Sequence, residues 1–174
     1  MDIRPVRFSI SPTGGDRIHY ITPEDVQIVL SRLPVEEYSQ LKAVHFNDQA
    51  WGNRLLGYTN RGRREIALCA LPPRVSLTRY LRRGQSPRQF GAKRGAQWSE
   101  LAVRRFMLYD VLLHEIGHLQ LIVPDSKNPK RKFAGETLAQ EFAESWCHKL
   151  LSIHFDHPDP VHNYPTKEEI SLLG

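Results

Sequence analysis

A long apolar stretch that carries two histidines and a glutamate constrains the fold of this chain most strongly. Apolar side chains recur at helical spacing from 101 to 119, and Ser99 before them and Pro124 after them are typical helix boundaries. A helix this apolar is expected to be buried, and buried polar side chains need partners. The residues that need partners here are His114, Glu115 and His118.

The spacing of the two histidines places both on one face of the helix. Residues four apart lie about 40° apart around the axis, so His114 and His118 can offer ring nitrogens to one metal ion. Glu115 then lies beside the water that such an ion holds. The sequence His114-Glu115-Ile116-Gly117-His118 therefore predicts a zinc hydrolase with one Zn²⁺ per chain. A glycine inside the helix indicates that another element packs closely against it. The alternative is a buried helix whose histidines make only ordinary hydrogen bonds.

A second helical pattern, from 135 to 146, offers a third ligand, because catalytic zinc typically has three protein ligands and a water. Its apolar face is expected to contain Leu138, Ala139, Phe142, Ala143, Trp146 and Leu150. Glu136 lies about 70° from the centre of that face, whereas Glu141 and Glu144 lie about 150° away and should face solvent. Glu136 is therefore the predicted third ligand. The alternative is an acid that merely suits the N-terminal end of a helix dipole.

These two segments resemble the gluzincin zinc peptidases, in which His-Glu-x-x-His is followed by a glutamate on the next helix. The second segment is similar to the Glu-x-x-Ala-x-x-Phe-Ala pattern of small bacterial single-domain members, the minigluzincins and the repressor-cleaving and radiation-response metallopeptidases. The residues that carry this pattern are Glu136, Ala139, Phe142 and Ala143.

The resemblance implies a role for each residue of the site. His114, His118 and Glu136 would bind zinc, and Glu115 would be the general base. The small side chain of Ala139 would let the two helices approach closely. The chain departs from the larger gluzincins at Gln140, where they often carry an aspartate that orients a histidine.

The order of patterns predicts an α+β fold in a single domain. A helix is expected from Thr22 to Pro34, a strand at 41–46, and a hairpin of strands at 54–59 and 65–71. The resemblance implies a small antiparallel or mixed sheet before the zinc-binding helix, with an edge strand that binds substrate as an added strand. The domain would span residues 1–174, with a core at about 20–153 and extended tails at 1–19 and 154–174.

Composition favours a cytoplasmic protein without a membrane span. The start of the chain has no apolar run that could export it, and the most apolar helix contains charged residues. Cys69 and Cys147 lie in apolar segments, so we interpret them as core residues rather than a disulfide.

Basic residues are concentrated from Arg74 to Arg105, where Glu100 is the single acid, and the formal net charge is +5. Within this region, 84–95 is expected to be a flexible loop, and a second basic stretch lies at 127–132. We favour a solvated basic surface, with an acidic or DNA-associated partner as the alternative.

Residues 152–162 are rich in histidine and aspartate and are expected to form a surface tail. The alternatives are a second metal site, or a tail that covers the cleft with His154 or His157 reaching the zinc. Tyr109, His148 and Tyr164 could stabilise the oxyanion of a substrate, although packing or surface roles are expected for each.

Taken together, the patterns predict a zinc metallopeptidase that hydrolyses peptide bonds of a protein substrate, with Glu115 as general base. The alternative is a regulatory or nucleic-acid-associated binding module with little or no turnover.

Overall fold

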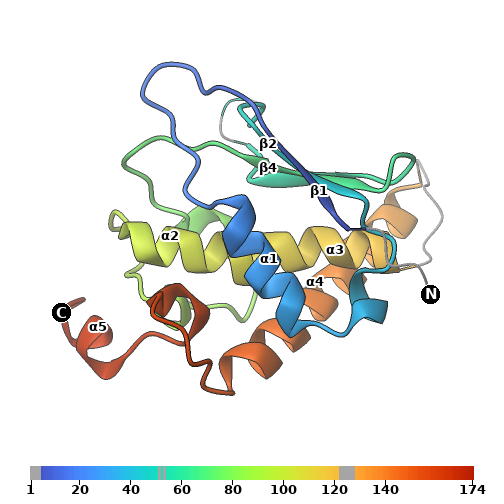
Figure 1. Ribbon diagram of the computed structural model, residues 1–174. Coiled ribbons are helices and arrows are strands. Elements are labelled where there is room, and N and C mark those ends of the chain that lie inside the picture. The colour runs from blue at the N-terminus through green and yellow to red at the C-terminus, as the bar shows by residue number, and fades with distance from the viewer. Residues whose placement is uncertain (1–4, 51, 53, 122–127) are drawn as a thin grey trace.

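The computed structural model describes residues 5–50, 52, 54–121 and 128–174. It has an α+β fold in which a mixed sheet lies over a layer of helices, and the longest helix packs on the far side of that layer (Figure 1). The α+β fold class predicted from the sequence is confirmed. The elements are β1 (Arg7–Ile10), α1 (Pro23–Arg32), β2 (Ala43–Asn47), β3 (Gly57–Asn60), β4 (Glu65–Cys69), α2 (Glu100–Phe106), α3 (Leu112–Gln120), α4 (Pro129–Leu151) and α5 (Lys167–Ser171).

The sheet has the strand order β1-β2-β4-β3 within the described residues. β1 runs parallel to β2 and β2 parallel to β4, whereas β3 and β4 form the predicted antiparallel hairpin. β4 is buried almost throughout, as expected for a strand covered on both faces. β3 therefore forms the edge of the sheet on the side of the hairpin.

The expectation of a tail before residue 20 is wrong for β1. Its residues pair with β2 along their whole length, from Arg7 opposite Ala43 to Ile10 opposite Phe46. The residues from Arg7 to Ile10 alternate polar and apolar side chains, which is a strand pattern, but it extends over only 4 residues and most of the strand is exposed. Pairing with β2, far along the chain, stabilises it.

α1 and the helix that begins at α2 start where the sequence predicts, whereas α4 (Pro129–Leu151) extends well beyond the predicted segment 135–146 at both ends. Thr22 caps α1 in a reciprocal pair with Asp25, and Ser99 caps α2. α2 continues through a π-helical segment, Met107–Val111, into α3, so one continuous helical rod, the α2–α3 rod, carries His114, Glu115 and His118. Pro124, the predicted end of that rod, and residue 127 of the second basic stretch lie outside the described residues.

The core lies between the sheet and the α2–α3 rod. Cys69 and Cys147 are both buried and unpaired, which confirms their prediction as core residues. The core side chains that are fully buried and largest include Phe46, Ile66, Leu68, Leu71, Leu77, Phe90, Phe106, Met107, Leu108 and Leu112. No helix in the described ranges is long and apolar enough to cross a membrane.

Residues 84–95 are not the exposed flexible loop that was expected. They contain a 3₁₀ turn, Pro87–Phe90, closed by a capping box between Ser86 and Gln89. Phe90 is buried and lies edge-on to the ring of Phe106. An aromatic side chain among turn residues therefore ties this segment into the core.

The C-terminal segment is also packed rather than extended, which corrects the predicted tail at 154–174. It contains the 3₁₀ turn Pro160–His162 and α5. The fully buried guanidinium of Arg105 donates hydrogen bonds to the carbonyl oxygens of Phe90, Pro160 and Asn163. A charged group within the sequence-predicted basic region thus holds the C-terminus in place, because a buried guanidinium needs several acceptors.

Candidate metal centre

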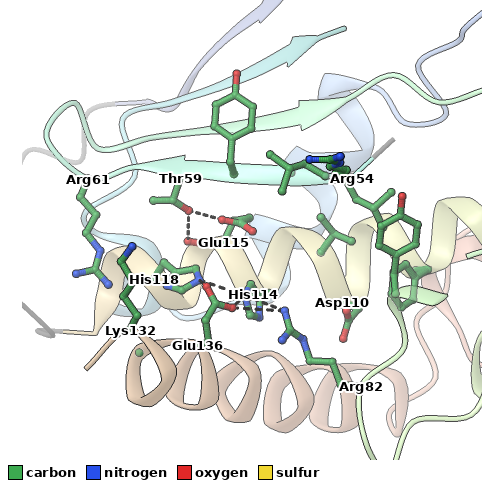
Figure 2. A pocket seen from close by; sticks show the side chains of 18 residues that line it. Arg54, Thr59, Arg61, Arg82, Asp110, His114, Glu115, His118, Lys132 and Glu136 are labelled. Carbon is green, nitrogen blue, oxygen red and sulfur yellow. Dashed lines mark hydrogen bonds and ion pairs between the residues drawn. The ribbon is translucent and has the colours of Figure 1, made fainter. Parts of the chain in front are cut away.

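α3 presents His114 and His118 toward the same point. Their Nε2 atoms lie 3.1 Å apart and their rings meet edge to face (Figure 2). His114 is buried and His118 half-buried, so both histidines face inward from one turn of the helix. This is the arrangement that the four-residue spacing predicts.

α4 brings Glu136 to these two histidines. Its Oε2 lies 3.0 Å from the Nε2 of His114, and its Oε1 lies 3.0 Å from the Nε2 of His118. One ligand atom from each of the three residues lies within 4.8 Å of the other two. The side chain is 48% exposed, so Glu136 closes the cluster on its solvent side.

Gly117 makes the approach of α4 possible. A Cβ atom on this residue would lie 3.1 Å from both the Cα and the carbonyl oxygen of Ala139, which is closer than nine in ten real Cβ contacts. The predicted close packing at Gly117, and the need for a small residue at Ala139, both agree with this geometry. Without a side chain at Gly117, the backbones come near enough for Glu136 to reach the histidines.

The three residues fit a zinc ion. Zn–N and Zn–O bonds of about 2.0–2.1 Å in a tetrahedron place neighbouring ligand atoms about 3.3 Å apart. Here the two Nε2 atoms lie 3.1 Å apart, and each lies 3.0 Å from one of the two carboxylate oxygens of Glu136. Hydrogen bonds from His114 and then His118 lower the pKa of Glu136, so its carboxylate is ionised and able to bind a cation. Two imidazoles and one carboxylate form a donor set typical of catalytic zinc.

Gln140 orients His114. Its Oε1 lies 2.9 Å from the Nδ1 of His114 and accepts the hydrogen bond from that nitrogen. The Nε2 atom faces Glu136, and a metal bound there would take the place of the Nε2 hydrogen. Gln140 stands where the larger gluzincins often carry an aspartate, and its amide oxygen supplies a hydrogen-bond acceptor as that aspartate would. Because Gln140 follows Glu136 by one helical turn, both side chains face the same histidine.

Asp110 and Gln85 hold Gln140 in turn. The amide of Gln140 donates to Oδ1 of Asp110 over 3.1 Å, and the amide of Gln85 donates to the same oxygen over 2.7 Å. Burial raises the pKa of Asp110, and these two amides oppose that effect. Sequence reasoning missed both residues, although a carboxylate one turn before His114 in an apolar helix was an available signal.

The rotation of α4 reflects these polar contacts. Leu138, expected on the apolar face, is 41% exposed, whereas Gln140 is only 7% exposed. The buried face of α4 therefore includes Gln140 rather than Leu138, because Gln140 makes buried hydrogen bonds to His114 and Asp110. Glu141 and Glu144 are exposed, as predicted.

Glu115 lies on the flank of α3 that faces the sheet, next to the histidines. Its Oε2 accepts a hydrogen bond from the hydroxyl of Thr59 on β3 over 2.5 Å, and the side chain points toward that strand (Figure 2). Burial raises the pKa of Glu115, although nearby His114 opposes the shift. Gly57 allows β3 to come this close, because a Cβ there would lie 3.0 Å from the side chain of Val111.

These groups line one cavity of about 570 Å³ between β3, α3, α4 and the segment at 80–82. Arg82 reaches into it: one of its guanidinium nitrogens lies 3.4 Å from Nε2 of His114 and 3.5 Å from Oε2 of Glu136. Neither Thr59 nor Arg82 was singled out from the sequence, since a lone threonine or arginine in a loop or strand gives no local signal.

The other candidate residues do not line this cavity. Tyr109 is buried and hydrogen-bonded to Arg32 and His162, and Tyr164 lies beside His148. These are the packing and surface roles that were expected. The cavity lining also lacks the two histidines proposed as alternative zinc contacts from the C-terminal segment, His154 and His157.

Comparison of the chain with models of protein families, with curated proteins and with solved structures gives no match. The geometry of the site therefore carries the functional interpretation.

Proposed function

We propose that this protein is a zinc-dependent metallopeptidase that hydrolyses peptide bonds of a polypeptide substrate. One observation carries the proposal. Three ligand atoms, from His114, His118 and Glu136, converge at the wall of a cavity that also contains the buried carboxylate of Glu115. Within the described residues the cluster has three protein ligands, which fits a catalytic zinc with one open position rather than a closed structural site of four.

Zinc bound to these residues would supply a Lewis acid that lowers the pKa of a water molecule and polarises a substrate carbonyl. Gln140 would hold His114 in the tautomer that keeps its Nε2 free for the metal. Glu136 would neutralise part of the charge of the ion, and its half-exposed side chain borders the open side of the site.

Glu115 would act as the general base. Its buried carboxylate takes a proton from the attacking water and later gives it to the departing amine. The hydroxyl of Thr59 donates a hydrogen bond to the Glu115 carboxylate and so fixes its position before the proton transfer. Arg82 is the cationic side chain nearest the ligand atoms in the cavity lining, so it is well placed to stabilise the negative charge that develops on the substrate carbonyl oxygen.

The edge strand β3 would bind the substrate backbone. β3 pairs with β4 on one side, and its residues Gly57 to Thr59 line the cavity on the other. An extended peptide added there would run past Glu115 and the three ligands, with its backbone groups paired to the strand.

Metal content tests this proposal directly. We expect about one zinc per chain in the wild-type protein, and a sharply lower content in Glu136→Ala, measured by elemental analysis of proteins purified without added metal. Glu115→Gln should keep the zinc and lose peptide hydrolysis by several orders of magnitude.

Retention of zinc by Glu136→Ala would move the third ligand to another residue. Full hydrolysis by Glu115→Gln would contradict the assigned base. A zinc-loaded wild type that cleaves no peptide in a proteome-derived mixture would instead favour a binding module built around the same site.

A further inference from the structure

Basic side chains surround the cavity at the candidate metal centre. They come from four separate segments: Arg54 precedes β3, Arg61 follows it, Arg82 lies after the 3₁₀ turn Thr78–Tyr80, and Lys132 lies in the first turns of α4. In Figure 2, Arg61 and Lys132 lie beyond His118, whereas Arg54 lies toward the opposite end. Chain segments far apart in sequence thus place cations at both ends of one cavity.

Two acids in the cavity lining, Asp110 and Glu115, are held by groups other than these cations. Asp110 is held by two amides, and Glu115 accepts from Thr59. Glu136 lies between two histidines. Glu136 also lies 3.5 Å from the guanidinium of Arg82, so it offsets part of the charge of that residue. Arg54, Arg82 and Lys132 are all exposed at the rim of the cavity.

Most of the basic region found in the sequence does not contribute to this rim. Of the residues from Arg74 to Arg105, Arg82 is the basic one that lines the cavity. Arg104 is bound to Asp25 and Asp159, and Arg105 holds the C-terminal segment. The positive character of the cavity is thus a product of folding rather than of one basic stretch.

We propose that the substrate is an acidic polypeptide segment, bound along β3 with carboxylate side chains on both sides of the bond that is cleaved. This inference rests on the proposed peptidase function for the bond cleavage, and on the charge of the rim for the substrate class. Carboxylates before and after the cleaved bond would meet the Arg61–Lys132 end and the Arg54 end. The rim charges would favour acidic over basic peptides by steering and by rejection of like charge.

A peptide suits this cavity better than a nucleic acid does. Phosphate backbones are bound by continuous basic tracks, often with stacking surfaces for the bases. Here the cations at the two ends are separated by the ligand cluster and Glu115. The strand edge of β3 supplies the backbone donors and acceptors that an extended peptide uses.

Fluorescence anisotropy with zinc-loaded Glu115→Gln protein would test the inference. The probes are a labelled peptide with aspartate and glutamate at alternate positions, the same peptide with lysine in place of each acid, and labelled oligothymidylate. We expect the acidic peptide to bind at least about tenfold more tightly than the basic peptide at low ionic strength, with a difference that shrinks in salt.

Two double variants distinguish the effect of the rim residues on binding from the effect of a change in net charge. Arg61→Glu with Lys132→Glu should weaken binding of the acidic peptide by about tenfold. Arg63→Glu with Lys130→Glu makes the same charge change at exposed neighbours outside the cavity lining, and should leave the affinity nearly unchanged.

The inference is overturned by equal affinity for acidic and basic peptides, by equal losses in the two double variants, or by tighter binding of oligothymidylate. Preference for the acidic peptide without hydrolysis by zinc-loaded wild type would sustain the substrate class and contradict the peptidase function. Peptide hydrolysis by the wild type without any preference for the acidic peptide would support the peptidase function and contradict the proposed substrate class.

Discussion

Gln140 shows how one residue can replace another in a supporting role. An amide oxygen accepts the Nδ1 hydrogen of His114 as a carboxylate would, but an amide can rotate and present its nitrogen instead. Asp110 prevents this, because it binds the amide nitrogen of Gln140. The orientation of His114, the proposed zinc ligand, therefore depends on Gln140 and Asp110, and Gln85 holds Asp110 from a third segment.

We predict that Gln140→Leu lowers zinc affinity by about 10–100-fold, since loss of the acceptor frees the His114 ring to rotate. The affinity is measured by competition with a chromogenic chelator. Glu144→Gln is the control, because Glu144 is an exposed neighbour that accepts from the same amide but does not touch His114. Equal affinity in Gln140→Leu and wild type would show that His114 needs no such partner.

α3 and α4, which carry the proposed zinc ligands, meet at a contact set by Gly117. Alanine is the better helix former by about 1 kcal/mol, yet its Cβ would lie 3.1 Å from the backbone of Ala139 and from the ring of Phe142. Because backbone cannot yield as a flexible side chain can, α4 would have to move away from α3. A movement of α4 carries Glu136 with it.

We predict that Gly117→Ala destabilises the fold by about 1–3 kcal/mol and also weakens zinc binding. Chemical denaturation and chelator competition give the two quantities. Gly62→Ala is a matched control in the β3–β4 turn, where the nearest atom to an added Cβ lies 3.6 Å away. If Gly117→Ala were as stable as Gly62→Ala and bound zinc normally, the packing argument would be wrong.

At the scale of the whole molecule, the C-terminal segment is locked against the helical layer. Arg32 on α1 donates to Tyr109, to the carbonyl oxygen of His162 and to the carbonyl oxygen of Leu150, so one side chain joins four parts of the chain. The Tyr109 hydroxyl donates in turn to Nδ1 of His162. Burial, and then the nearby His157, lower the pKa of His162 to about 4.

We predict that protonation of His162 destabilises the fold in acid. Its pKa is lower in the folded state, so the unfolded state binds more protons between pH 6.5 and 4, and stability falls as the pH drops through that window. The expected loss from this group is about 2–3 kcal/mol. Urea denaturation of the metal-free protein at a series of pH values measures it.

His162→Asn keeps an acceptor for Tyr109 but does not titrate, so its stability should depend less on pH in this window than that of the wild type. His154→Asn is the control, because His154 is exposed. Identical pH dependence in His162→Asn and wild type would exclude His162 as the origin.

Local pattern was enough to predict the ligand-bearing parts of the molecule. The four-residue spacing of His114 and His118 holds in any α-helix, so their shared face follows from the sequence alone. The caps of α1 and α2, the β3–β4 hairpin and the outward direction of Glu141 and Glu144 are also set within a few residues of chain.

The remaining features depend on contacts between distant segments, which no local pattern encodes. The place of β1 beside β2 is decided by their pairing, and the C-terminal segment is ordered because Arg105 binds its carbonyl groups. The hydrogen bond between Gln140 and His114 likewise joins residues that are separate in the chain. The same is true of the cations at the two ends of the cavity. Spacing within a helix determines which side chains share a face, but only packing of α4 and β3 against that face decides which groups meet there.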